Sequence, residues 1–175
     1  KFRQAMTIKN AIWAIKNKTN KNLKLFASIQ AWDEVSTKDI MKQLVDYPFD
    51  GFALGGMVPR VRDPETILNL VKTIRKIDSE RPLHVFGIGK PQLIQELFEL
   101  GVTSTDSSSF LRATADKKYL SPIDLKWVDL KTNVEALPIC KCCSCQSYDQ
   151  KYLRLPGETN NLALALHNLF VTQIN

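Results

Sequence analysis

Apolar residues recur along the first 106 positions in two alternating patterns. Four segments carry apolar side chains at helical spacing, and four shorter segments are apolar without a period, as in strands buried on both faces. The predicted helices span residues 3–16, 36–47, 63–77 and 91–100, and the predicted strands span residues 23–30, 50–56, 81–89 and 101–106. A helix before each of four strands indicates a parallel sheet with helical crossovers.

Residues that favour helix ends bound several of these segments. Ser36 and Thr37 are predicted to cap the second helix, and Asp63 with Pro64 marks the start of the third. Gly101 is predicted to end the fourth helix. The faces expected to be buried are Ala5, Ile8, Ala11, Ile12 and Ile15 in the first helix and Ile67, Leu70, Val71 and Ile74 in the third.

Every predicted strand ends in something small or polar, at Gln30, Gly55–Gly56, Gly87–Gly89 and Asp106. In (β/α) barrels, ligands bind at these carboxyl ends of the strands. Four helix–strand units make half of an eight-unit barrel. We therefore predict an α/β fold in which residues 1–122 form the C-terminal half of a (β/α)8 TIM barrel, with the missing N-terminal half-barrel upstream. Residues 123–175 are expected to form a separate subdomain.

Composition adds little to this prediction. A chain of 175 residues with 44% hydrophobic residues is ordinary for one soluble domain. No apolar run approaches the roughly 20 residues of a membrane span, and the start lacks both a signal-peptide core and an initiator Met. We therefore expect a cytoplasmic fragment with no membrane partner. The net charge of +6 fits an ordinary basic protein or one with a polyanionic partner.

All four cysteines lie in PICKCCSCQ, residues 138–146. They are too close together to connect distant parts of a fold, and a reducing compartment disfavours disulfides. The C-x-C-x-x-C spacing of Cys140, Cys142 and Cys145 can bring three thiolates to one metal ion, and His167 can supply the fourth ligand. Four protein ligands with no open position predict structural Zn2+. Cys143 is then the spare, and it could replace Cys142.

The two histidines of the chain each have a simpler interpretation. His167 lies in a predicted helix that is expected to pack Leu162, Leu166, Leu169 and Phe170 inward. A histidine on such a face is usually a hydrogen-bonded core residue, and here the three thiolates upstream favour a ligand. His84, within a predicted strand, is expected to be packed or to line a site.

The C-x-C-x-x-C plus His pattern, RPLHVFGIGKP and GVTSTDS together resemble the tRNA-guanine transglycosylase family, the queuine and archaeosine tRNA-ribosyltransferases. DGFALGGMVPR, HVFGIGKP and LALHNL are most similar to the archaeosine-type branch. The resemblance extends over nearly the whole chain. It implies a zinc-bearing (β/α)8 barrel that excises guanine from a polynucleotide and inserts a 7-deazaguanine base.

The resemblance also implies roles for single residues. Asp106 matches the family's nucleophile, which attacks the ribose anomeric carbon and forms a covalent intermediate. Gln30 matches a glutamine that hydrogen-bonds the purine edge, and the turn at Gly55, Gly56 and Met57 matches one whose backbone contacts the base. Phe86 occupies the position of a side chain that stacks on the base. The residues alone leave open that Asp106 caps a helix, Gln30 is a polar strand end and Phe86 is core.

Two further features bear on the match. Lys90, Arg60 and Arg62 follow strand ends, where they could contact phosphates or form a solvated rim. The chain departs from the family pattern at Ala31 and Trp32, where the family has glycines, and at Thr103, Ser104 and Thr105 before the nucleophile.

Two functions remain open at this stage. One is a pentosyltransferase that acts on tRNA, or alternatively on DNA, of which this chain alone is an incomplete enzyme. The other is a non-catalytic zinc-containing partner subunit, although the carboxylate of Asp106 favours the enzyme. An open half-barrel would expose sheet edges and apolar surface, so we expect pairing with the missing half or with a second copy in a homodimer.

Overall fold

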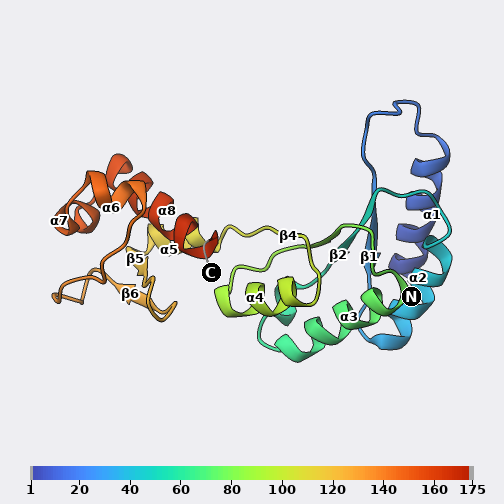
Figure 1. Cartoon of the computed structure of the whole chain (residues 1–175), viewed down its shortest axis with the longest axis horizontal. Helices are drawn as coiled ribbons and strands as arrows, with labels where there is room; N and C mark the ends of the chain where they lie inside the picture. Colours follow the sequence, from blue (N-terminus) through green and yellow to red (C-terminus); the bar gives the residue numbers. More distant parts are fainter. Residues whose placement is uncertain (1, 174–175) are drawn as a thin grey trace. The chain divides into compact units, whose positions relative to one another are not determined.

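The computed structural model describes residues 2–173, which form two compact units, one ending at Asp106 and the other beginning at Ser107 (Figure 1). Each unit has a hydrophobic core of its own. Residues 107–122, which the sequence interpretation assigns to the half-barrel, contain α5 (Ser109–Ala115) and β5 (Lys118–Leu120), and both elements contact helix α8 (Glu158–Gln173) of the second unit. A functional boundary after residue 122 stays a prediction.

The first unit is a four-stranded parallel sheet in the order β1-β2-β3-β4. Its strands are β1 (Phe26–Gln30), β2 (Gly51–Gly55), β3 (Leu83–Val85) and β4 (Ser104–Thr105). Its helices are α1 (Phe2–Lys16), α2 (Glu34–Leu44), α3 (Pro64–Ile77) and α4 (Pro91–Glu99), with the short 3-10 helix η1 (Val58–Arg60) after β2. The predicted order of elements and the parallel pairing are confirmed.

Strands β3 and β4 are shorter than the predicted strands over 81–89 and 101–106. Gly87 adopts a φ of 78°, which turns the chain out of the sheet soon after Val85. Gly101 adopts a φ of 88° as it ends α4, so the chain enters β4 only at Ser104. In both places the left-handed glycine conformation belongs to a turn and not to a strand.

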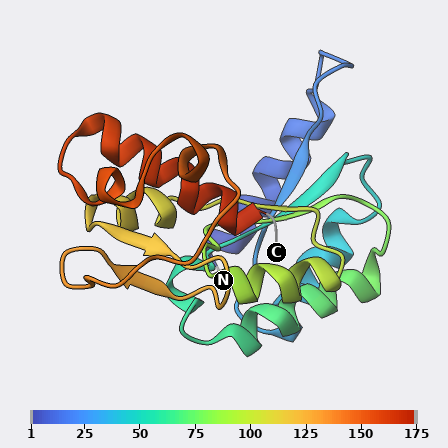
Figure 2. The same cartoon turned by 60° about the vertical axis from the view of Figure 1, so that its left-hand side comes forward.

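Helices α1 to α4 cover one face of the sheet. Each helix contacts the next one in sequence, and both α1 and α2 contact β1. Figure 2 shows α3 and α4 side by side. The strand residues that point to this face are completely buried, and they are Ala27, Ile29, Phe52, Leu54, Leu83 and Val85. Since neighbouring strand residues point to opposite faces, the residues between them lie on the face that these helices leave uncovered.

The helix boundaries confirm some predicted caps and correct one. Asp63 caps α3 through the Thr66 amide, and Pro64 is its first residue, as predicted. Helix α2 begins at Glu34, not at Ser36, because Asp33 is its N-cap and Ser36 completes a capping box with it. In α1, Ile8 is buried while Ala5 is exposed, so the predicted face is narrower than expected.

The second unit is built around α8. Its strands β5 and β6 (Trp127–Asp129) form an antiparallel pair. Helices α5, α6 (Cys143–Ser147) and α7 (Gln150–Arg154) all contact α8. The buried core consists of Tyr119, Leu130, Leu137, Leu153, Ala163 and Leu164.

The buried face of α8 differs from the predicted one. Leu162 and Leu166 are 59% and 42% exposed, whereas Leu164, His167, Asn168 and Val171 are completely buried. These four residues form one stripe at helical spacing. The helix is rotated this way because His167 and Asn168 hydrogen-bond to strand β5. Within residues 2–173, no helix combines the length and apolar character that crossing a membrane requires.

Candidate active site and metal centre

Four of the predicted site residues lie in one row at the carboxyl edge of the parallel sheet. Gln30, the last residue of β1, pairs in register with Gly55, the last residue of β2. The residues just before Gly55, Phe86 and Asp106 are aligned with one another across β2, β3 and β4. Residues in register on parallel strands point to the same face. We call Gln30, Gly55, Phe86 and Asp106 the strand-end row. It lies on the face that α1 to α4 leave uncovered.

A second row lies two residues earlier along each strand. Ser28, Ala53, His84 and Ser104 are paired in register across all four strands. This second row faces the same side as the strand-end row, and its members are small or polar. Barrel interiors are usually filled by bulky Val, Ile and Leu side chains. On β3 and β4 the second row is polar, and the His84 ring lies 2.8 Å from the Ser104 hydroxyl beneath the strand-end row.

The carboxylate of Asp106 is held through one of its oxygens. Its Oδ1 accepts a hydrogen bond from the Gly87 amide at 2.9 Å and lies 3.3 Å from His84 Nε2. The side chain is 60% exposed, whereas that of His84 is 18% exposed. The sequence interpretation left His84 as a packed or site-lining residue, and the structure places it against the predicted nucleophile.

The space above Gly55 lies between two predicted substrate-binding side chains. A Cβ added to Gly55 would lie 3.6 Å from Gln30 Nε2 and 4.0 Å from Phe86 Cδ2. The Phe86 ring is 44% exposed and meets the His84 ring edge-on, with centroids 4.5 Å apart. An amide and an aromatic ring on either side of a glycine can accommodate a flat heterocycle.

Gly56 and Met57, the other two residues of the predicted turn, differ in exposure. Gly56 is exposed and adopts a φ of 77°, with no atom within 4 Å of an added Cβ. Met57 is completely buried in the core. Its side chain is therefore not brought to the strand-end row, and only the backbone of this turn can face a ligand there.

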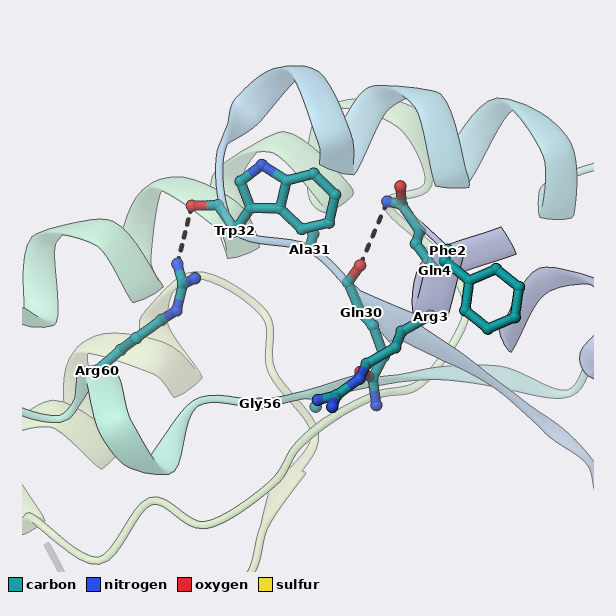
Figure 3. Close-up of a pocket in the computed structure, with 9 residues that line it drawn as sticks. Phe2, Arg3, Gln4, Gln30, Ala31, Trp32, Gly56 and Arg60 are labelled. Atoms are coloured by element: carbon teal, nitrogen blue, oxygen red, sulfur yellow. Dashed lines mark hydrogen bonds between the residues drawn. The ribbon is translucent and has the colours of Figure 1, made fainter. Parts of the chain in front are cut away.

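A cavity of about 520 Å³ opens beside Gln30 (Figure 3). Its lining combines strand-end residues with the start of α1, and comprises Phe2, Arg3, Gln4, Gln30, Ala31, Trp32, Gly55, Gly56 and Arg60. Gln4 donates hydrogen bonds to the carbonyls of Gln30 and Ser36, which ties α1 to the end of β1. Arg60 donates to the Trp32 carbonyl at 2.8 Å.

Arg3 and Gln4 were missed by the reasoning from sequence. Their spacing marks them as the first turn of an amphipathic helix, and nothing local shows that this turn lies beside the end of β1. The Asp106–His84 contact was missed because it depends on the register of β3 and β4. The histidine in LHVFGI was the available signal, since a polar ring within an apolar strand needs a partner.

The second predicted site is a compact cluster in the second unit. One atom each from Cys140, Cys142, Cys145 and His167 lie within 4.8 Å of one another. His167 Nδ1 lies 3.5 Å from Cys142 Sγ and 3.3 Å from Cys145 Sγ. A tetrahedral ion at about 2.3 Å from sulfur and about 2.0 Å from nitrogen would set such separations at about 3.5 Å. Cys143 is exposed and lies outside the cluster, so Cys142, and not Cys143, is positioned to bind a metal ion.

Hydrogen bonds with backbone groups orient the side chains of this cluster. Cys142 is the N-cap of α6, and its sulfur accepts from the Cys145 amide at 3.4 Å. The sulfur of Cys140 accepts from the Cys142 amide at 3.5 Å. His167 uses Nε2 to donate to the Leu120 carbonyl at 2.9 Å, which leaves Nδ1 for the cluster. The Tyr119 ring stacks on the imidazole at 3.9 Å.

Burial disfavours the charged forms of the side chains in the cluster. Burial raises the pKa of the Cys140 and Cys145 thiols, and it lowers the pKa of His167 to about 4. A neutral imidazole is the form that binds metal, and a cation would stabilise the buried thiolates. Cys140, Cys142, Cys145 and His167 are thus positioned to bind a metal ion. Four protein ligands leave no position for substrate, which is typical of a structural site.

Comparison with known proteins finds a matching family and relatives that carry two names, queuine tRNA-ribosyltransferase and tRNA-guanine(15) transglycosylase. A family model described as queuine tRNA-ribosyltransferase matches residues 3–174. The chain is 31% identical over 134 residues to the tRNA-guanine(15) transglycosylase of Pyrococcus abyssi, covering 74% of this chain and 22% of the relative. It is 25% identical over 173 residues to the protein of the same name from Methanococcus aeolicus, covering 95% of this chain and 26% of the relative.

A bacterial protein is similar over a comparable stretch. The chain is 27% identical over 164 residues to a queuine tRNA-ribosyltransferase of Helicobacter pylori, covering 88% of this chain and 43% of the relative. The chain therefore spans about a quarter of the archaeal relatives and less than half of the bacterial one.

Proposed function

This chain belongs to the queuine tRNA-ribosyltransferase family, and from that premise we propose that it carries the nucleophile of a base-exchange transglycosylase. The observation that carries the proposal is the strand-end row. It gathers Gln30, Gly55, Phe86 and Asp106, which end or directly follow four different strands, at the edge of the sheet where barrel enzymes place their active sites.

In the proposed first step, a carboxylate oxygen of Asp106 forms a bond to the anomeric carbon of a guanosine. The bond between that carbon and guanine N9 breaks, and its electron pair leaves on the base, which a general acid protonates. In the second step, the incoming base loses its N9 proton to that group, and N9 attacks the anomeric carbon and displaces Asp106. Splitting one displacement into two keeps the polynucleotide on the protein between the steps.

The remaining members of the strand-end row would hold the base. The Gln30 amide can both donate to and accept from a purine edge. The exposed Phe86 ring supplies a flat apolar surface for stacking. The base must leave its helical stack to reach Asp106, and ordering on these two side chains would offset part of that cost.

We further propose that the sheet is half of a (β/α)8 barrel. The helices lie on one face only, and the opposite face carries two aligned rows of small and polar residues. Further strands would cover this face and supply the general acid. Pairing of two copies also stays a prediction, which light scattering on the purified protein tests.

The metal of the second unit is proposed to be Zn2+ with a structural role. Three thiolates and one imidazole are the ligands that structural zinc favours. When bound, the ion would fix the loop of Cys140, Cys142 and Cys145 against α8. Metal analysis by mass spectrometry of the purified protein checks the identity of the ion.

The decisive experiment measures incorporation of radiolabelled guanine by the full-length protein. Wild type is compared with Asp106→Asn and with Asp39→Asn, a control at an exposed position on α2. The polymers are bulk tRNA, duplex DNA and single-stranded DNA, and incoming 7-deazaguanine bases are tested as competitors. We expect exchange into tRNA, lowered at least about a thousandfold by Asp106→Asn and unchanged by Asp39→Asn.

Other results would redirect the proposal. Exchange into DNA would keep the chemistry and change the substrate. No exchange into any polymer by folded, metal-bound protein would favour a non-catalytic partner subunit.

A further inference from the structure

We propose that His84 is a positioning residue that orients the nucleophile by engaging one oxygen of Asp106 and leaving the other to attack. This inference rests on the function proposed above. It adds His84 to that site and assigns different roles to the two oxygens of Asp106. It starts from the contrast between the His84 side chain, which is 18% exposed, and the Asp106 side chain that it contacts, which is 60% exposed.

The two oxygens of Asp106 differ in their surroundings. Both described contacts of the carboxylate, from the Gly87 amide and from His84 Nε2, converge on Oδ1. A carboxylate held at one oxygen by two donors from different directions cannot rotate freely about its Cβ–Cγ bond. The other oxygen, Oδ2, has no described contact on a side chain that is 60% exposed, and we assign to it the bond to the anomeric carbon.

Asp106 and Ser104 lie at opposite nitrogens of the His84 imidazole. An ionised carboxylate only accepts hydrogen bonds, so Nε2 carries the proton in this contact. In a neutral imidazole Nδ1 is then an acceptor, and the Ser104 hydroxyl lies 2.8 Å from it. The serine hydroxyl can donate to this acceptor, which stabilises the tautomer with the proton toward Asp106.

The register of the sheet explains why this contact forms. His84 and Ser104 are direct partners in the second row, while Asp106 lies one layer above them. His84 is long enough to reach from the second row to the strand-end row, and the Phe86 ring packs against it edge-on. The sheet thus positions Asp106 from below, while the Asp106 side chain stays 60% exposed.

The test measures formation of the protein–polynucleotide adduct by the full-length protein, under single-turnover conditions. The variants are His84→Leu, His84→Gln and Ser104→Ala. Gln can place an amide donor near the position of Nε2. Ser28→Ala is the matched control for Ser104→Ala, because Ser28 lies in the same second row on β1, away from Asp106.

We expect His84→Leu to slow adduct formation about 10- to 100-fold, as misplaced reacting groups do, with KM changed less than about threefold. His84→Gln should recover most of the rate. Ser104→Ala should cost about fivefold, and Ser28→Ala should match wild type. Thermal unfolding should change little in any variant that keeps its metal, which separates positioning from a merely structural role.

Crystal structures of full-length wild type and His84→Leu give a readout independent of activity. We expect Asp106 Oδ1 to stay on the Gly87 amide in wild type and the carboxylate to rotate in the variant. If wild type is active and His84→Leu is equally active, the proposed role of His84 is overturned and the proposed function of the chain is not. An inactive wild type would overturn the proposed function. The crystal structures would still test the positioning role, which an unchanged Asp106 carboxylate in His84→Leu would overturn.

Discussion

The strand-end row of the first unit and the Cys/His cluster of the second are the two candidate sites of the chain, and their residues are held in different ways. The cluster is closed, since each ligand is aimed by a backbone group or by burial. The row is open, with Phe86 and Asp106 exposed on a sheet face that α1 to α4 leave uncovered.

The difference follows from where the partners of each site come from. Cys140, Cys142 and Cys145 lie within six positions, and His167 approaches them on one helix. The strand-end row instead takes one residue from the carboxyl end of each of four strands, and its substrate would lie on the uncovered face. A structural site can be complete within one small unit, whereas an active site must leave one side open.

Removing a metal ligand should have the largest effect. Cys142→Ser is expected to abolish stoichiometric metal binding and to unfold the second unit, because structural zinc contributes on the order of 10 kcal/mol. Hydrogen exchange should show residues 107–173 unprotected while the first unit keeps its protection. Cys143→Ser, at the exposed neighbouring position, serves as the control. Retention of one metal ion per chain by Cys142→Ser would contradict the ligand assignment.

A second test compares two glycines in the turns that follow strands β2 and β3. Gly87 and Gly56 have nearly the same φ, 78° and 77°. A Cβ at Gly87 would lie 2.3 Å from Val58 Cγ2, whereas one at Gly56 meets open space. We expect Gly56→Ala to destabilise the first unit by about 1 kcal/mol from backbone strain alone, and Gly87→Ala by about 2 to 4 kcal/mol because a clash is added.

The added clash can be isolated by a double variant. Gly87→Ala with Val58→Ala should recover the difference between the two glycine variants, as measured by hydrogen exchange of first-unit amides. Equal costs for the two single variants would show that Val58 moves aside, and that the turn after β3 is softer than the structure indicates.

The smallest expected effect is a difference in acid sensitivity between the units. Burial opposes ionisation of Asp78, but hydrogen bonds and the charge of Arg81 outweigh it and hold the pKa of Asp78 below its ordinary value of 3.8. Its contribution to the first unit is therefore complete above about pH 4 and is lost as the pH falls through the lower folded value. Metal should leave the second unit at higher pH, as its thiolates take up protons.

An acid titration with both metal release and first-unit hydrogen exchange measured tests this order. Asp78→Asn should cost about 1 to 2 kcal/mol at neutral pH, because Arg81 also donates to the Val45 and Tyr47 carbonyls and loses its charged partner. Glu34→Gln, which removes an exposed pair with Lys38, should cause no measurable change. First-unit unfolding at higher pH than metal release would reverse the predicted order.

The same contrast explains what could be predicted from the sequence. The ligand set followed from the spacing of three cysteines and one histidine, because their chemistry is specific and mostly local. The parallel order of the first unit followed from apolar patterning. The buried face of α8 did not, since leucines at 162 and 166 are as apolar as the buried stripe and only the bonds of His167 and Asn168 to β5 decide the rotation.

Contacts that depend on strand register were also out of reach. His84 and Asp106 are 22 positions apart and meet only because Val85 aligns with Thr105. The start of α1 lies at the Gln30 cavity for a similar reason, since its place depends on how the helix packs along β1. The N-cap of α2 was misassigned because Asp33, Ser36 and Thr37 are all good capping residues, and the geometry selects Asp33.

The alignment of the strand-end row sets where this family can change length during evolution. A single residue inserted between Phe26 and Gln30 would turn Gln30 toward the helices, because successive strand residues alternate in direction. The same insertion in the segment between α1 and β1 would leave the row intact. Length variation among relatives should therefore collect in the connections between helices and strands, while the strands keep their length even where their side chains diverge.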